Sequence, residues 1–337
     1  MGKQSDRIKY WDIAKGISML LVIIGHTQIP YTLTAIIFSF HMPLFFIVSA
    51  YFIHTINLKK NINSANKHLI IPFAAGTLVE MFCTCLSGDT FGSVISQIKT
   101  LFLDFCGGMC KASPLFPHFN GTWILWFLPC LAVSRIIFVS VFRLLQEKPW
   151  YYMAFASFLI TGFGFLLSKW SYLPWCAEIA CVSFLFLYFG YILAKKNIFA
   201  RRKLSLILFG ISLAFWGFCV AFLRTFIELA MHSYPYSFIS ILEGCAGTFC
   251  VVYVCKKFEN LRVFSEPLAW IGANSLIILI FHNAEYRYMP WNTLLSTFTD
   301  KAYYWLILSC SKILLILTLT FLYSQIQKAI LSHRRIR

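Results

Sequence analysis

Three histidines lie in apolar stretches of this chain, where an ionisable side chain is costly to bury and therefore informative. His26 ends the stretch 8–26, His41 lies deep inside a second apolar stretch, and His282 ends a third one near the C-terminus. An imidazole titrates near neutral pH, so it can act as a general base or as a nucleophile. The three histidines therefore predict a site for acid–base or nucleophilic chemistry inside the fold.

The first stretch carries two further charged residues on the same helical face as His26. Asp12, Lys15, Met19, Val22 and His26 follow intervals of three and four residues, which form one stripe on a helix. Lys15 and His26 are three turns apart, a rise of roughly 16 Å. Charges within a membrane span face a bundle interior or a cavity. This stripe therefore predicts an anion site at Lys15 and a reactive site at His26, with Asp12 positioning Lys15.

A simpler interpretation of the stripe stays open. Asp12 and Lys15 form an ordinary pair near the membrane surface, with the lysine reaching to the headgroups, while His26 only ends the helix. Two features of the other stretches favour a site. His41 stands two residues before Pro43, which frees a backbone carbonyl and predicts a kink. Ser275 and His282 share one helical face, so they are candidates for substrate binding.

Composition indicates the elements that must position these residues. The chain has 337 residues, of which 59% are hydrophobic and 12% charged, whereas soluble domains are about 25% charged. Stretches of roughly 20 apolar residues predict membrane-spanning helices. We expect an all-α, polytopic helical bundle in a single domain, residues 1–337, without an internal repeat. The ten predicted spans are 10–27, 31–56, 69–87, 121–143, 150–168, 175–194, 203–223, 236–256, 267–284 and 302–326.

The formal charge of +16 is distributed in a way that predicts orientation. With ten spans, twenty of the 29 Lys and Arg residues fall in segments on the side of the termini, and six fall on the other side. Cytoplasmic loops carry such an excess of Lys and Arg, so both termini are predicted to be cytoplasmic and no nucleic-acid partner is needed. The segments 88–120 and 284–301 are then the longest outer loops.

The twelve cysteines do not form a zinc motif with paired spacing. Most lie inside predicted helices, where cysteine behaves as a small hydrophobic residue. In an oxidising compartment a disulfide could form among four cysteines in or near the first outer loop, although their spacing does not determine the pairing. These are Cys83, Cys85, Cys106 and Cys110.

Two further groups of residues have both a structural and a functional interpretation. The other charges within predicted spans are Glu80, Arg135, Glu243 and Lys312. Arg135 either supplements Lys15 in binding an anion or pairs with one of the two glutamates. Trp123 and Trp126 mark the outer end of the fourth span, where they either belong to the aromatic belt or stack on a sugar.

Four segments of the sequence resemble the acyltransferase family 3 membrane proteins, in the same order along the chain. They are "DIAKGISMLLVIIGH", "FSFHMPLFFIVSAYF", "TWILWFLPCL" and "IGANSLIILIFH". Within this family the chain is most similar to the branch of fucose 4-O-acetylase-like sugar acetyltransferases. The family typically has an arginine at the position of Lys15, and lysine keeps its charge without the bidentate fork.

The resemblance implies an integral membrane O-acyltransferase of the cell membrane. Its donor is expected to be cytoplasmic acetyl-CoA, and its acceptor a hydroxyl of a sugar, polysaccharide or lipid-linked glycan. His26, Asp12 and His41 are then the catalytic candidates, Lys15 and Arg135 the donor-binding ones, and Trp123, Trp126, Ser275 and His282 the acceptor-binding ones. No metal is expected to take part. The alternative from another class is a transporter or flippase for a glycan or small solute, which ten spans with buried charges suit equally well.

Overall fold

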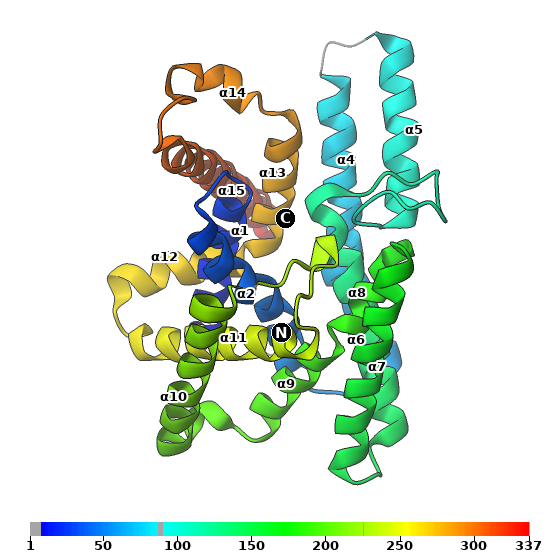
Figure 1. Ribbon diagram of the computed structural model, residues 1–337. Helices are drawn as coiled ribbons and strands as arrows, with labels where there is room; N and C mark the ends of the chain where they lie inside the picture. The colour runs from blue at the N-terminus through cyan, green and yellow to red at the C-terminus, as the bar shows by residue number, and fades with distance from the viewer. Residues whose placement is uncertain (1–7, 87–89, 225, 337) are drawn as a thin grey trace.

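The computed structural model describes residues 8–86, 90–224 and 226–336, and the side chains up to residue 332. These residues form helices and turns without a β-strand, apart from two isolated bridges, so the all-α prediction is confirmed for this part of the chain. The α-helices, drawn in Figure 1, are α1 Lys9–Gly25, α2 Tyr31–Tyr51, α3 Leu58–Ala65, α4 Ile71–Cys85, α5 Phe91–Gly107, α6 Phe127–Leu145, α7 Trp150–Trp170, α8 Ala177–Val182, α9 Phe184–Lys195, α10 Arg202–Phe218, α11 Phe238–Phe258, α12 Arg262–Ala273, α13 Ser275–Tyr288, α14 Trp291–Leu294 and α15 Tyr304–Ile336.

Within the described residues, seven helical segments are long and apolar enough to cross a membrane. They are Tyr31–Tyr51, Leu58–Cys85, Trp123–Leu145, Trp150–Trp170, Arg202–Leu223, Phe238–Phe258 and Tyr304–Ser332. The number rises to nine if α8 with its preceding turn joins α9, and α12 joins α13, as one bent span each. The first of the ten predicted spans corresponds to α1, which has only 17 residues and is not among them. A multi-pass membrane protein is thus supported, whereas ten spans and the side of the termini remain predictions.

The two bent spans differ from the straight helices that apolar length predicts. The chain bends by 57° between α8 and α9 and by 71° between α12 and α13. Each break lies at a polar residue that bonds to its own helix: the Ser183 hydroxyl donates to the Ala180 carbonyl, and the Asn274 amide to the Trp270 carbonyl at 2.8 Å. Such local bonds compete with the helical ladder and explain why the helices end there.

One loop also differs from the predictions. The predicted outer loop 88–120 contains a full helix, α5, which packs beside α4 (Figure 1). The second predicted span contains α2, which continues as one helix through Pro43, and the kink at this proline stays a prediction. The Pro43 ring packs beside Gly244 of α11, where the absence of a side chain leaves it room.

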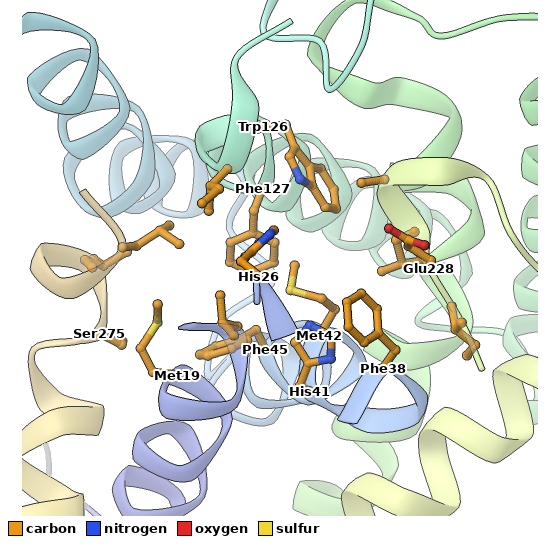
Figure 2. Close-up of a pocket in the computed structure, with 17 residues that line it drawn as sticks. Met19, His26, Phe38, His41, Met42, Phe45, Trp126, Phe127, Glu228 and Ser275 are labelled. Carbon is orange, nitrogen blue, oxygen red and sulfur yellow. The ribbon is translucent and has the colours of Figure 1, made fainter. Parts of the chain in front are cut away.

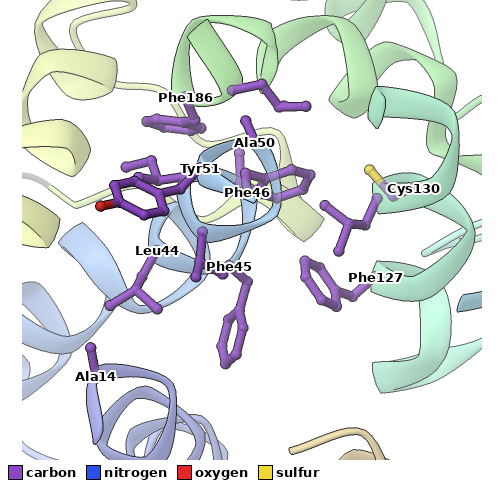
Figure 3. Packing of buried hydrophobic residues seen from close by; sticks show 14 of the residues in the cluster. Ala14, Leu44, Phe45, Phe46, Ala50, Tyr51, Phe127, Cys130 and Phe186 are labelled. Carbon is purple, nitrogen blue, oxygen red and sulfur yellow. The ribbon is translucent and has the colours of Figure 1, made fainter. Parts of the chain in front are cut away.

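The interior is built around α2, which packs on α1, α9 and α11. Figure 3 shows its apolar side chains meeting those of neighbouring helices. The Phe46 ring lies 5.4 Å from that of Phe127 on α6 and 6.5 Å from that of Phe186 on α9, measured between centroids. Close contacts of this kind drive helix association where no water is displaced. They fix α2, and with it His41, at the centre of the bundle.

The crossing of α1 and α12 depends on two glycines. A Cβ added at Gly272 would overlap the backbone carbonyl of Asp12, and one added at Gly16 would overlap the carbonyl of Leu268. Small residues allow two helix backbones to approach closely in this way. The crossing holds the base of α1, which carries Asp12 and Lys15, against α12.

We expect Gly272→Ala to destabilise the protein, because the α1 backbone must move away to accept the methyl group. Overpacking of this kind typically costs about 1–3 kcal/mol. Gly210→Ala on α10 is the matched control, since a Cβ there has nothing within 4 Å. The measurement is the thermal unfolding midpoint of the detergent-solubilised variants. Equal midpoints for the two variants would contradict this role of Gly272.

Candidate active site

His26 follows the last turn of α1 and is where two cavities meet. One cavity is mostly apolar and reaches His26 from the side of α2; we call it the apolar cavity (Figure 2). Its lining comprises Met19, Val22, His26, Phe38, His41, Met42, Phe45, Ile124, Trp126, Phe127, Ile227, Glu228, Leu229, Ala230, Ser275, Leu276 and Leu279. The His26 side chain is solvent-exposed, although the α1 residues before it are largely buried. His26 is therefore the residue at this end of α1 that substrates can reach through the two cavities.

The second cavity is more polar, and we call it the polar cleft. It is lined by Gly25, His26, Thr27, Gln28, Tyr286, Met289, Pro290, Trp291, Asn292, Thr293, Tyr304, Leu308 and Lys312. Most of these residues come from the segment after α13 and from the start of α15. His26 belongs to both linings, so a group in either cavity can reach its ring.

His41 is held in a defined orientation on the floor of the apolar cavity. Its Nδ1 lies 2.7 Å from the Ile37 carbonyl oxygen, which can only accept, so Nδ1 carries a proton. The Phe38 ring packs edge-on against the imidazole at 4.8 Å. Nε2 is the nitrogen that His41 can offer to a ligand. His26 and His41 thus line the same cavity, and their catalytic roles stay a prediction.

His282 stands beside His26 but lines neither cavity. The centroids of the two imidazoles are 5.3 Å apart. His282 is fully buried, and its Nδ1 lies 3.0 Å from a carboxylate oxygen of Glu285. Its Nε2 is buried and has no hydrogen-bond partner among the described residues. A buried imidazole oriented by a carboxylate on one nitrogen leaves the other nitrogen to act on its neighbour, here His26.

Glu285 is the centre of a buried polar network that sequence reasoning missed. Besides His282, it pairs with the Lys312 ammonium at 3.2 Å and accepts a hydrogen bond from the Trp291 indole. Lys312 in turn lies over the Tyr286 ring, 5.2 Å from its centroid. Lys312 stood out in the sequence as a charge within a span, but its partner lies on a different helix. The spacing of three residues between His282 and Glu285 was the available signal for this pair.

Glu228 is a second acidic residue that the sequence did not single out. It lies in the segment between α10 and α11 and lines the apolar cavity with His26 and His41 (Figure 2). Burial raises the pKa of its carboxyl, and the charge of Lys111 opposes this shift. A carboxyl whose pKa is raised in this way is suited to donate a proton as well as to accept one.

The residues of the predicted anion site lie apart from the two cavities. Lys15 and Asp12 form the expected pair, with 2.7 Å between the ammonium and the carboxylate, but neither residue lines a cavity with His26. The Arg135 guanidinium donates to the Asn61 side-chain oxygen at 3.2 Å. Glu80 pairs instead with Arg287 and with Asn283.

The four predicted acceptor-binding residues are not gathered at one place. Trp126 and Ser275 line the apolar cavity, as Figure 2 shows, whereas Trp123 and His282 do not. Trp123 is half exposed, and its ring lies 6.0 Å from that of Tyr286. The polar cleft provides aromatic and amide side chains that were not predicted, among them Trp291, Asn292 and Tyr304.

The fold and site define a class: a multi-pass helical membrane protein with a histidine site enclosed by its spans. The comparison with known families agrees with this class. Residues 8–328 match the model of the family 3 acyltransferase domain, and the chain belongs to this family. It is therefore a membrane acyltransferase. No curated protein sequence matches the chain significantly.

Proposed function

We propose that this acyltransferase moves an acetyl group from cytoplasmic acetyl-CoA to a hydroxyl of a sugar, polysaccharide or lipid-linked glycan at the cell membrane. The observation that carries the proposal is the position of His26 between an apolar cavity and a polar cleft. Acyl transfer requires a donor with an apolar thioester arm and a polar acceptor to meet at one group. The apolar cavity suits the donor arm, and the polar cleft suits the acceptor. His26 is the group that both substrates can reach.

In the proposed reaction, His26 removes the proton from the acceptor hydroxyl while the oxygen attacks the thioester carbonyl. The new C–O bond forms the ester, the C–S bond breaks, and the coenzyme A thiolate takes up a proton. His41 faces the same cavity, where its unprotonated Nε2 accepts a hydrogen bond and so orients the donor or the acceptor hydroxyl. Nε2 of His282, which Glu285 leaves free, has no partner among the described residues and lies on the imidazole next to His26; in the proposed reaction it accepts a hydrogen bond from His26 and so fixes the nitrogen that acts as base. The mechanism requires no metal ion.

The acceptor is assigned to the polar cleft because of its chemistry. Trp291, Tyr286 and Tyr304 present aromatic rings, whose faces suit the apolar face of a sugar, and Asn292 presents an amide suited to hydroxyl groups. This assignment replaces Trp123 and His282 as direct acceptor contacts. Trp126 and Ser275 instead border the thioester end of the donor.

The test of this function is a comparison of surface glycans from cells with and without the chain. We expect glycans from cells with the chain to carry an acetyl increment by mass spectrometry, and those from cells with a His26→Ala variant to lack it. Identical glycans in all three strains, together with no acetyl-CoA consumption by the purified protein, would refute the proposal.

We further propose that Lys15 binds the anionic part of the donor, three turns from His26. Lys15→Ala should then raise the KM for acetyl-CoA by about 10-fold or more, because a hydrogen bond to a charged group contributes about 1.5–3 kcal/mol. Lys15→Arg keeps the charge and should stay close to the wild type. Lys9→Ala removes a more exposed lysine of the same helix as the control. An unchanged KM for Lys15→Ala would exclude Lys15 from the donor site.

The predicted orientation can be tested by labelling single cysteines in intact cells. The background replaces the exposed cysteines Cys85, Cys106 and Cys310 by serine. An impermeant thiol reagent should label Lys301→Cys but neither Lys59→Cys nor Arg202→Cys, because the basic loops are predicted to be cytoplasmic. All three positions are exposed in the structure, so burial does not explain a missing label. Labelling of the Arg202→Cys variant from outside would contradict the orientation.

A further inference from the structure

A second cluster of reactive side chains lies outside the two cavities. Ligand atoms of Cys110, Glu178 and His232 all lie within 4.8 Å of one another. The three residues come from three segments: the turn after α5, the start of α8, and the segment between α10 and α11. Cys110 and Glu178 are buried, and the His232 side chain is only 9% exposed. A thiol, a carboxylate and an imidazole are the three ligand types that zinc takes in proteins.

Each of the two polar ligands is oriented by a further hydrogen bond. Nδ1 of His232 donates to the Ser168 carbonyl at 2.9 Å, which leaves Nε2 to face the cluster. One carboxylate oxygen of Glu178 accepts from the Leu173 backbone N–H at 3.1 Å, and the other lies 3.0 Å from Nε2 of His232. Metal-binding histidines typically donate their second nitrogen in this way, and ligating carboxylates are likewise held by hydrogen bonds. The Tyr172 ring, stacked 4.1 Å from the imidazole, fixes it further.

We propose that Cys110, Glu178 and His232 bind one Zn²⁺ ion that ties these three segments together. Ligand atoms on a tetrahedral zinc are roughly 3.3–3.8 Å apart, as follows from bond lengths of about 2.0–2.3 Å. The cluster approaches this arrangement with small side-chain shifts. Binding displaces the thiol proton of Cys110 and the proton shared by His232 and Glu178. With these three ligands, two protons leave as the doubly charged ion enters, so the net charge of the buried site is unchanged; a further thiolate ligand makes it more negative by one.

A fourth ligand is available from the same region. The buried thiol of Cys176, two residues before Glu178, donates to the Gly108 carbonyl at 3.4 Å, and Gly108 lies two residues before Cys110. Structural zinc sites are mostly four-coordinate with protein ligands, so in the proposal Cys176 turns from this carbonyl to the ion and completes the set. The thiols of Cys110 and Cys176 would alternatively form a disulfide, which would remove the zinc site. The two outcomes differ by a measurable mass.

The proposed ion has a structural role beside the active site. Ile227, Glu228, Leu229 and Ala230 line the apolar cavity, and His232 ends the same short segment. Two backbone hydrogen bonds between Glu228 and Ser233 close this segment into a tight loop. Zinc at His232 would hold the loop against the turn after α5 and the start of α8. This inference does not depend on the identity of the donor or acceptor.

The test measures zinc in the full chain purified in detergent. After chelation, incubation with Zn²⁺ and removal of excess metal, elemental analysis should find about one zinc ion per chain. Cys110→Ser and His232→Ala should bind zinc at least 10–100-fold more weakly, since even the loss of a hydrogen-bond partner of a metal ligand typically has an effect of about this size. Cys106→Ser and His118→Ala remove an exposed thiol and an exposed imidazole that are not members of the cluster, so both variants serve as controls and should keep the metal.

A second measurement covers the case in which a variant fails to fold. In the unmodified chain, Zn²⁺ should raise the unfolding midpoint relative to chelator, because it binds only the folded state. Co²⁺ should give a thiolate-to-metal absorption band that is absent in Cys110→Ser. The proposal is overturned if the unmodified chain holds no zinc, if His232→Ala holds as much as the wild type, or if mass spectrometry finds a Cys110–Cys176 disulfide.

Discussion

Replacing His26 by alanine is expected to abolish acyl transfer while the protein stays folded. Among the residues that the structure describes, His26 alone lines both cavities, and it is the one imidazole in the lining of the polar cleft. General acid–base catalysis contributes about 10²–10⁴-fold, and kcat should fall by at least this factor. The measurement is the turnover of acetyl-CoA by the purified variant, with an acceptor identified from the glycan comparison.

The structure gives this prediction a clear control. His26 follows the end of α1 and is exposed to the cavities, so its truncation leaves the packing of α1 intact. His54 is also exposed and lines neither the apolar cavity nor the polar cleft, so His54→Ala should keep full activity. Both variants should elute and unfold like the wild type. Normal turnover in a folded His26→Ala variant would remove His26 from the reaction.

Much of this site could be predicted from helical periodicity. The intervals from Asp12 to His26 placed the pair of Asp12 and Lys15 correctly, as well as Met19, Val22 and His26 on the face that lines the apolar cavity. A period of 3.6 residues is a local property, so a sequence can show which residues share a face. The same reasoning placed His41 in the interior, where α2 is surrounded by other helices.

Relations between distant segments could not be predicted in this way. His282 was expected among the acceptor contacts, but the bend at Asn274 separates α13 from α12 and brings His282 beside His26 instead. Apolar length does not show such a bend, because both halves remain apolar. Arg135 could have met several partners, and only the packing of α3 on α6 explains its bond to Asn61. These contacts depend on which helices are neighbours.

The cluster of Cys110, Glu178 and His232 shows the same limit for metal sites. Zinc motifs are found in sequences when the ligands are closely spaced along the chain. Here each ligand lies on a separate segment, with more than fifty residues between one and the next. Spacing along the chain therefore does not predict this metal site, and the proposal of a structural zinc ion rests on the fold alone.

Glu285→Gln is expected to lower kcat by about 10²–10³-fold, with a much smaller effect on the KM for acetyl-CoA. The carboxylate lies 3.0 Å from Nδ1 of His282 and thereby selects Nε2 as the nitrogen that faces His26. An amide can present its N–H to His282 and favour the opposite tautomer, which would leave His26 without an acceptor for its own N–H. Because Glu285 acts through His282, it is a positioning residue, and its loss should slow the reaction without weakening donor binding.

A purely structural effect of Glu285→Gln, acting through the buried Lys312, can be tested separately. Glu285→Gln also leaves this ammonium without its carboxylate, which would lower stability whatever the catalytic role. The variant Glu285→Asp keeps the charge for Lys312 and His282 and should restore part of kcat, whereas Glu266→Gln on α12 removes an exposed carboxylate as the control. If the variant is only destabilised, the fraction of folded protein falls while kcat per folded chain stays unchanged. If the folded Glu285→Gln variant turns over like the wild type, the pair of His282 and Glu285 does not orient His26.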